Sequence, residues 1–389
     1  MKEWKEYKIG DVFAYLKSGK GIHANEISSK GEYPVFGGNG LRGYTTRNNF
    51  EGDCAIIGRQ GAFCGNVRYF KGKAYMTEHA IIAVANENNS TRFLAYLLGI
   101  MNLGRFSGQS AQPGLSVTEL AKQSITVPSL SVQKKIATIL SSLDDKIELN
   151  RRINGNLEQQ VQALFKAWFV DFEPFKDGKF VDSELGKIPE GWKVGRLDEI
   201  GEIVGGGTPS KSKAEYYCDK GIPWVTPKDL SITHAKFTSK GEVDISDLGY
   251  KNSSTQILPK GSVLFSSRAP IGYITIALND ICTNQGFKSV IPKIAGTAFI
   301  YCYLKNNIKN IESQATGSTF KEASGSLMKS LKVLKPDDIS IYRRFEEVET
   351  SLFEKQAALE EENLRLSTLR DTLLPQLMSG ELKIDSLNR

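Results

Sequence analysis

The sequence predicts an α+β protein in which two similar globular domains are separated by two long helices that pack as an antiparallel coiled coil, with pseudo-twofold symmetry. Three observations predict this arrangement: an internal repeat, short β-branched and aromatic runs bounded by turn residues, and two long stretches with coiled-coil spacing. We expect these boundaries: a first domain at 1–128, a helix at 129–175, a linker at 176–191, a second domain at 192–336, and a second helix with a tail at 337–389.

The internal repeat is the strongest of the three observations. "WKEYKIGDV" at Trp4 and "WKVGRLDEI" at Trp192 share an offset of 188 residues. Further on, "GDCAIIGR" (52–59) matches "GSVLFSSR" (261–268), and "TEHAIIAV" (77–84) matches "TNQGFKSVI" (283–291) more loosely. A repeat this long indicates a duplicated domain rather than a solenoid.

Each globular half reads as α+β. Runs such as residues 54–57 and 263–265 are rich in strand-forming residues and are bounded by Gly, Asn and Ser. Helical patterning is limited to one segment in each half, "TRFLAYLLGI" and "TAFIYCYLKN". A short apolar run and a proline, Pro128 or Pro336, then lead into a long helix.

Both long helices carry apolar residues at steps of three and four, the spacing of a coiled-coil seam. Asn150 and Asn154 lie on the first seam, where buried asparagines set the register. Two helices in one chain most simply pair with each other, although pairing between two chains is the alternative. The residues expected in the coiled-coil core are Ile136, Leu140, Leu143, Ile147, Leu157, Val161, Leu164, Phe345, Val348, Leu352, Leu359, Leu366, Leu369 and Leu373.

Three further features of the helices lead to expectations. We expect Pro375 and Gly380 to end the second helix, and the tail to return to the first domain. The acidic run at 360–362 is typical of a solvated face. The aromatic residues near the end of the first helix exceed what one seam needs, so they either pack on the adjoining domain or dock a partner subunit. These docking candidates are Phe165, Trp168, Phe169 and Phe172.

Composition bounds the class of protein. The hydrophobic content of 40% supports folded cores, and the net charge of +6 permits a nucleic-acid partner. Five cysteines without a CxxC pair argue against a disulfide framework or a zinc knuckle. Residues 1–20 lack the apolar core of a signal peptide and no apolar run has membrane-spanning length, so we expect a cytoplasmic protein.

Four segments together resemble one family: "PSLSVQKKIATILSSLDDKI" (128–147), "ALFKAWFVDFEPF" (163–175), "GKIPEGWKVGRLDEI" (186–200) and "LRDTLLPQLMSGEL" (369–382). In this order they look like the specificity subunit of type I restriction-modification systems, and the resemblance covers essentially the whole chain. "GGGTPSKSKAEYYCDKGIPWVTPKDL" (205–230) also resembles a common form of that family's recognition domain. The first half departs from that form, which implies that the two halves read different DNA words.

The resemblance implies a non-catalytic DNA reader within a system of DNA methylation and host defence. Each globular half would be a target recognition domain for one half of a bipartite, asymmetric site in double-stranded DNA. The paired helices would set the spacer and dock two modification subunits, which are adenine methyltransferases. In a complete endonuclease, two restriction subunits would join them. S-adenosylmethionine, ATP and magnesium would be bound by those partner subunits and not by this chain.

The residues themselves carry no recognisable catalytic motif. The chain has no GxxxxGK[ST] phosphate loop and no Asn/Asp-Pro-Pro-aromatic tetrapeptide. Its three histidines lie far apart in sequence, so we expect neither a catalytic triad nor a metal site; the segment "TEHA" reads as an ordinary strand edge. Two alternatives remain at this point: a coiled-coil scaffold without a DNA role, and a self-contained methyltransferase.

DNA recognition needs cations for phosphates and polar side chains for base edges. Residues of these types in glycine-punctuated loops are the candidates. Arg59 and Arg268 stand out because each follows a strand at an equivalent position, although each could instead hold a strand end through an ion pair. The DNA-binding candidates are Lys20, Asn39, Arg59, Gln60, Arg68, Arg105, Gln109, Gln112, Lys211, Lys213, Lys228, Arg268, Asn284, Gln285, Ser318 and Lys321.

Overall fold

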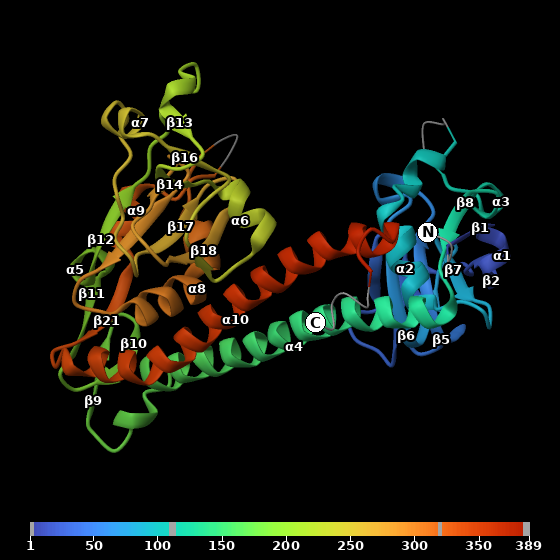
Figure 1. The fold of residues 1–389 in the computed structure, drawn as a ribbon. Helices are drawn as coiled ribbons and strands as arrows, with labels where there is room; N and C mark the ends of the chain where they lie inside the picture. Colours follow the sequence, from blue (N-terminus) through green and yellow to red (C-terminus); the bar gives the residue numbers. More distant parts are fainter. Residues whose placement is uncertain (1–3, 109–113, 318–320, 384–389) are drawn as a thin grey trace. The chain divides into compact units, whose positions relative to one another are not determined.

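A computed structural model describes residues 4–108, 114–317 and 321–383. The chain divides into two compact units: Met1–Glu148 with Leu364–Arg389, called unit 1, and Leu149–Asn363, called unit 2. Figure 1 shows that each unit combines a mixed α/β domain with one part of each long helix. Among the described residues, no helix is long and apolar enough to cross a membrane, and no three His, Cys, Asp or Glu side chains cluster as metal ligands.

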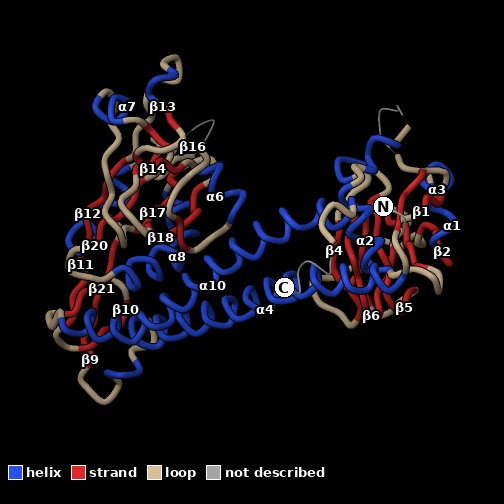
Figure 2. The backbone as a smooth tube through the Cα atoms, in the orientation of Figure 1, coloured by secondary structure: helices blue, strands red, loops and turns tan. Residues whose placement is uncertain are grey.

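Unit 1 is built around one six-stranded sheet. Its spatial order is β2-β7-β5-β6-β3-β4, and the β3–β6 pair is parallel while the other pairs are antiparallel. The strands are β2 (Phe13–Ser18), β3 (Tyr33–Gly37), β4 (Gly40–Thr45), β5 (Phe50–Gly58), β6 (Val67–Met76) and β7 (Ala80–Ala85). Figure 2 shows these strands gathered beside helix α2 (Thr91–Ile100).

A separate two-stranded ladder joins the two ends of the first domain. Its strands, β1 (Lys5–Lys8) and β8 (Ser124–Val127), pair antiparallel. The short helices of unit 1 are α1 (Ile9–Val12), α3 (Val117–Ala121), η1 (Ala24–Glu26), η2 (Gly61–Phe63) and η3 (Leu103–Phe106).

Unit 2 has a five-stranded sheet of order β12-β20-β17-β18-β15. Beside it lies a four-stranded sheet of order β13-β16-β14-β19, in which the parallel pair β14–β19 corresponds to the parallel pair β3–β6 of unit 1. The strands of the larger sheet are β12 (Gly201–Gly205), β15 (Phe237–Thr238), β17 (Val263–Ser267), β18 (Ile271–Ala277) and β20 (Lys288–Pro292). Those of the smaller sheet are β13 (Tyr217–Cys218), β14 (Ile222–Val225), β16 (Val243–Ile245) and β19 (Cys282–Thr283).

The remaining elements of unit 2 complete the domain. β11 (Trp192–Arg196) pairs with β21 (Lys332–Pro336) as β1 pairs with β8. Residues 176–191, expected as a linker, include a hairpin of β9 (Phe180–Ser183) and β10 (Gly186–Pro189). The shorter helices are η4 (Glu173–Phe175), α5 (Leu197–Ile200), η5 (Ala214–Tyr216), α6 (Pro227–Thr233), α7 (Asp247–Lys251), α8 (Thr297–Gln314) and α9 (Gly325–Ser330).

The internal repeat of the sequence is a repeat of topology. Strands β2-β7-β5-β6 of unit 1 follow the same spatial order as β12-β20-β17-β18 of unit 2. Helix α2 packs on β5 and β6, as α8 packs on β17 and β18. The α+β prediction with two similar domains is therefore confirmed, and the two helical segments expected in the domains are α2 and α8.

The two long helices are α4 (Leu130–Phe169) and α10 (Ser340–Ser379), and they pair antiparallel within each unit. In unit 1, Arg370 Nη1 donates to Asp144 Oδ1 at 2.8 Å. In unit 2, Asn150 Nδ2 donates to Glu362 Oε2 at 2.7 Å and to Asn363 Oδ1 at 3.0 Å. Both asparagines of the seam therefore make contacts between the helices, because Asn154 also donates to the Gln356 carbonyl.

The predicted seam is correct in α4 and partly wrong in α10. Of the α4 residues expected in the core, each is buried or half-buried. In α10, Val348 is 46% exposed and Leu369 is 47% exposed, while the adjacent Glu349 and the polar Gln356 are buried. The other five α10 residues expected in the core are buried or half-buried, so the apolar pattern follows the buried face only in part, because that face also carries polar side chains.

The end of α10 differs from the expectation at one of its two residues. Pro375 lies inside the helix, which continues to Ser379. The proline removes only the hydrogen bond to Asp371, an exposed position in the preceding turn. Gly380 then ends the helix with φ +73°, and its backbone lies against the Trp4 indole. The tail returns to the first domain as expected, because Leu382 packs on the unit 1 core.

Residues of the long helices belong to the same cores as the sheets. In unit 1, Ile136, Leu140 and Leu377 pack with α2 and the sheet. In unit 2, Phe165 and Phe169 pack against Phe299 of α8, at ring-centroid distances of 5.5 and 4.7 Å. Burial on this scale stabilises a unit by about 1.5–3 kcal/mol for each large apolar side chain.

Candidate nucleic-acid interface

One end of the unit 1 sheet is formed by a tight junction between two chain segments. Gly19 and Lys20 follow the last residue of β2, and their amides donate to the carbonyls of Ala80 and Met76, both at 3.0 Å. Met76 precedes the four-residue turn 77–80 between β6 and β7, and Ala80 is its last residue. The Ala80 amide donates to the Thr77 carbonyl at 3.0 Å and closes the turn. A Cβ at Gly19 would clash with the Met76 carbonyl, so the close approach requires glycine.

The residue after β5 is the third component of this junction. The Arg59 amide donates to the His79 carbonyl at 2.9 Å, and the Arg59 carbonyl accepts from the Leu115 amide at 2.8 Å. The guanidinium of Arg59 reaches the Glu78 carbonyl at 3.4 Å. The backbone of the turn is thereby held from two sides, and the side chains of residues 78 and 79 remain partly exposed.

Five of the DNA-binding candidates in unit 1 lie at this junction. Gln60 Oε1 is 2.9 Å from His79 Nδ1, and Arg68 Nη2 donates to the Asn39 carbonyl at 3.5 Å. The β3–β4 turn adjoins them, since the Cβ position of Gly38 lies 3.0 Å from the His79 carbonyl oxygen. The candidates gathered here are Lys20, Asn39, Arg59, Gln60 and Arg68.

Unit 2 repeats the same junction with other side chains. The amides of Gly206 and Gly207 donate to the carbonyls of Phe287 and Thr283 at 3.4 and 2.9 Å. The turn 284–287 is closed by the Phe287 amide on the Asn284 carbonyl at 3.2 Å. A Cβ at Gly206 would clash with the Asn284 carbonyl, just as Gly19 requires in unit 1. The glycines at the start of "GGGTPSKS" therefore allow the backbone to lie close to this turn.

Polar and charged side chains also surround the unit 2 junction. The Thr208 hydroxyl donates to Gln285 Oε1. Arg268 pairs with Glu322 at 3.1 Å, and Lys288 pairs with the same carboxylate at 3.3 Å. The side chains of Arg268 and Glu322 are 36% and 32% exposed, so this ion pair is accessible to solvent. Arg268 thus does make the ion pair that was the structural alternative for it.

The backbone hydrogen bonds correct the sequence alignment of the two halves. Ser267, not Arg268, has the bonds of Arg59: its amide donates to the Gly286 carbonyl at 2.7 Å and its carbonyl accepts from Ala323 at 2.9 Å. Arg268 is therefore equivalent to Gln60. The turn 77–80 likewise corresponds to 284–287, one residue later than the sequence alignment suggested.

The remaining candidates are more scattered. Arg105 stacks on Phe106 at 4.6 Å in η3, and Lys213 lies 5.1 Å from the Tyr216 ring. Lys228 pairs with Glu242 at 2.7 Å. Lys211 and Lys321 are exposed in loops. Three candidates, Gln109, Gln112 and Ser318, lie outside the described residues.

Sequence reasoning missed three residues of the two junctions: Glu78, His79 and Glu322. His79 Nε2 lies 3.1 Å from Glu78 Oε1, which extends the Gln60–His79 contact into a chain of three side chains. The missed signal was the repeat itself. An alignment that placed Glu78 opposite Gln285, already a candidate, would have included "TEHA" in the interface.

The aromatic docking candidates prove to be part of the unit 2 core. Phe165, Phe169 and Phe172 are 4%, 4% and 7% exposed, and Trp168 packs partly buried on the same cluster. Trp192 lies 5.9 Å from Phe169 between ring centroids. Their burial agrees with the first of the two alternatives, in which these aromatic residues pack on the adjoining domain.

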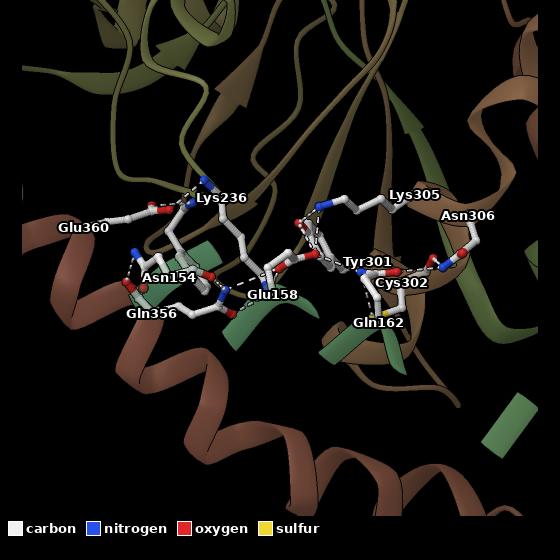
Figure 3. Close-up of polar contacts among 11 residues, drawn as sticks. Asn154, Glu158, Gln162, Lys236, Tyr301, Cys302, Lys305, Asn306, Gln356 and Glu360 are labelled. Carbon is white, nitrogen blue, oxygen red and sulfur yellow. Dashed lines mark hydrogen bonds and ion pairs between the residues drawn. The ribbon is translucent and has the colours of Figure 1, made fainter. Parts of the chain in front are cut away.

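A buried polar cluster fastens the second domain to its helices (Figure 3). Lys236, next to β15, donates to Glu158 Oε2 of α4 at 2.9 Å and to Gln356 Oε1 of α10 at 2.7 Å. Its ammonium also lies 3.6 Å from the centroid of the Phe353 ring. Glu360 of α10 accepts from the Lys236 amide at 3.0 Å, so the acidic run at 360–362 is not simply a solvated face.

The charges of this cluster compensate one another. Burial favours the neutral form of Glu158, but the ammonium groups of Lys236 and Lys305 outweigh it and lower the pKa of Glu158 to about 2. Burial lowers the pKa of Lys236, opposed by Glu158. The arrangement thus holds a buried cation between both helices and the domain, without a catalytic geometry.

Comparison with known proteins gives a consistent result. The sequence profile described as type I restriction modification DNA specificity domain matches residues 1–159 and 189–357. The HindI specificity subunit of Haemophilus influenzae is 30% identical over 331 residues, covering 69% of this chain and 71% of that protein. The MjaIX specificity subunit of Methanocaldococcus jannaschii is 41% identical over 161 residues, but this match spans only 41% of this chain and 37% of that protein.

A solved structure shares the fold. The S subunit of a type I restriction-modification system from M. genitalium superposes with a TM-score of 0.67, and the match covers 96% of each chain. At 19% sequence identity this likeness concerns the fold alone. It extends over both repeats and both long helices.

Proposed function

Because the chain belongs to the type I restriction-modification DNA specificity family, we propose that it is the non-catalytic DNA-recognition subunit of such a complex, with each unit reading one half of a bipartite, asymmetric site. The observation that carries this proposal is the shared junction. Both units hold an equivalent turn, 77–80 and 284–287, by the same backbone hydrogen bonds, yet they surround it with different side chains. The same backbone arrangement with different side chains is what we expect of two domains that recognise different DNA sequences.

The charges at the junctions fit contact with DNA. Lys20, Arg59 and Arg68 lie at the unit 1 junction, where they would neutralise phosphates and give a salt-dependent affinity. Gln60 and Asn39 beside them are of the types that hydrogen-bond to base edges. In unit 2, Arg268 and Gln285 take these two roles.

The long helices are proposed to set the spacer and to dock two modification subunits, which would supply adenine methylation with S-adenosylmethionine. In a complete endonuclease, two restriction subunits would add ATP- and magnesium-dependent cleavage. The helix contacts at Asn150 and Asn154 support a fixed register, since buried polar pairs between helices disfavour slipped alternatives. A fixed register would give a constant distance between half-sites.

A matched insertion tests the spacer role. Seven residues added to α4 after Glu148, and seven added to α10 after Asn363, fall at the boundary of the two units, keep the antiparallel pairing within each unit and lengthen the helix pair by roughly 10 Å, about three base pairs. Methylation mapping should then show an unspecified spacer longer by about three base pairs, with both half-site words unchanged. The same seven residues inserted in the β9–β10 turn, at Glu184, are the control and should leave the spacer as it was.

The DNA-binding role has its own test. Gel-shift titration of the chain together with its modification subunits should show tight binding to a duplex that contains the site found by methylation mapping. Binding to a duplex of scrambled sequence should be weaker. Equal affinity for both duplexes would overturn the proposal. An altered half-site word with an unaltered spacer in the insertion variant would overturn the spacer role alone.

A further inference from the structure

The equivalence of the two junctions singles out one side chain in each unit. Residues 78 and 285 occupy the same place in their turns, one residue after the carbonyl that closes each turn. Each lies near the residue two positions after the shared glycine, which is Gly19 in unit 1 and Gly206 in unit 2. The Cβ position of Gly21 lies 3.9 Å from Glu78 Oε2, and Thr208 donates to Gln285. Both side chains therefore lie on equivalent turns and near equivalent loops of their units.

Glu78 is an unusual residue at this place, because its neighbours are cations. Lys20, Arg59 and Arg68 lie around the junction, and Glu78 forms no ion pair with any of them among the contacts described. A carboxylate on a phosphate-binding surface repels phosphates. It is compatible with bound DNA when it faces base edges, where amino groups donate to it.

The Glu78 carboxylate is held in place and retains capacity to accept. Oε1 contacts His79 Nε2 at 3.1 Å, and the other ring nitrogen of His79 contacts Gln60 at 2.9 Å. Oε2 is buried, close to the Cβ position of Gly21, and has no hydrogen-bond partner within the described part of the chain, so an incoming amino group would bind Oε1, which has a second lone pair to accept with. The side chain is 43% exposed. His79 and Gln60 are thus positioning residues that orient Oε1 as the acceptor.

Resting on the proposed function, we propose that residues 78 and 285 each specify one base pair of their half-site, and that Glu78 selects a base carrying a major-groove amino group. Cytosine N4 and adenine N6 donate hydrogen bonds to a carboxylate. Guanine O6 and thymine O4 present acceptors at the same place, which a carboxylate repels. Gln285, an amide that both donates and accepts, imposes a different choice on the other half-site.

The substitution Glu78→Gln tests this directly, because it keeps the shape and adds a donor. The complex with modification subunits is titrated against duplexes in which each position of both half-sites is changed in turn. The wild type should prefer C or A at one position of the first half-site by roughly 5- to 150-fold over G and T. Glu78→Gln should lose most of that preference and leave the other half-site unchanged.

Two variants complete the experiment. Gln285→Glu should create a preference for C or A at one position of the second half-site only. Glu51→Gln, at the opposite end of β5, removes an exposed carboxylate that pairs with Lys73 at 3.4 Å and should leave both words unchanged. An unchanged word in both the position 78 and 285 variants, with a bipartite site still recognised, overturns this inference alone. If the wild-type complex recognises no bipartite site, the proposed function itself fails.

Discussion

Glu349 offers a direct test of how α10 is built into unit 2. Its side chain is fully buried on the helix face where an apolar residue was expected, and neither carboxylate oxygen has a hydrogen-bond partner among the described residues. Burial raises the pKa of Glu349 from 4.5 to about 7; Lys236 opposes this rise, and the carboxylates of Glu158 and Glu346 add to it. Below about pH 7 the protonated form is therefore the favoured one within the fold.

The sign and size of the effect follow from linkage. A carboxyl whose pKa is raised on folding binds a proton more tightly in the native state, so stability falls as pH rises from the unfolded value through the folded one. For a change from 4.5 to about 7, the cost at Glu349 grows from under about 1 kcal/mol at pH 5 to about 3 kcal/mol at pH 8. Glu349→Gln removes the ionisation and should abolish this loss.

The assay is urea unfolding at pH 5 and pH 8, followed by tryptophan fluorescence, which Trp168 and Trp192 report from the unit 2 core. The wild type should lose about 2.5 kcal/mol more between these pH values than the Glu349→Gln variant does. Glu347→Gln, an exposed neighbour on the same helix, should behave as the wild type. An identical pH dependence in wild type and Glu349→Gln would refute the burial argument.

Two further substitutions test other contacts by urea unfolding. Lys236→Met should destabilise unit 2 by about 3–5 kcal/mol, because it leaves buried acceptors without their cation, whereas the exposed Lys240→Met should have little effect. A loss below about 1 kcal/mol would show that the cluster is dispensable. Gly380→Ala should destabilise unit 1 by about 1–3 kcal/mol and perturb Trp4 fluorescence, since the new Cβ would lie 2.7 Å from the indole nitrogen. Gly61→Ala has a similar positive φ but open space around it, so equal losses in both variants would exclude the Trp4 contact as the cause.

The helix pattern shows where sequence periodicity succeeds and where it fails. In α4 the buried face is mostly apolar, so spacing alone located it. In α10 the buried face carries Glu349, Gln356 and Glu360, which bind or approach Lys236 from the second domain. A pattern of apolar residues cannot reveal polar side chains that are buried by a partner contributed from a distant segment. The apolar spacing therefore predicts Val348 in the core, although its side chain is exposed.

The candidate interface was predictable in kind but not in register. Five of the unit 1 candidates, which were predicted from residue type and neighbouring glycines, lie at one junction in the structure. Glu78 and His79 were not among the predicted DNA-binding residues for two reasons. An acidic residue is not a typical DNA-binding candidate, and the sequence alignment of the two halves was shifted by one residue at this turn. Only the backbone hydrogen bonds of the two turns fix that register, and sequence similarity there is too weak to do so.

Replacing residues 1–128 with the corresponding domain of another specificity subunit, followed by mapping of methylated sites, tests the central claim most directly. The account predicts that one half-site word changes while the other word is retained, because each unit carries its own junction. If both words change, or neither does, the two units do not read DNA independently, and the account is contradicted.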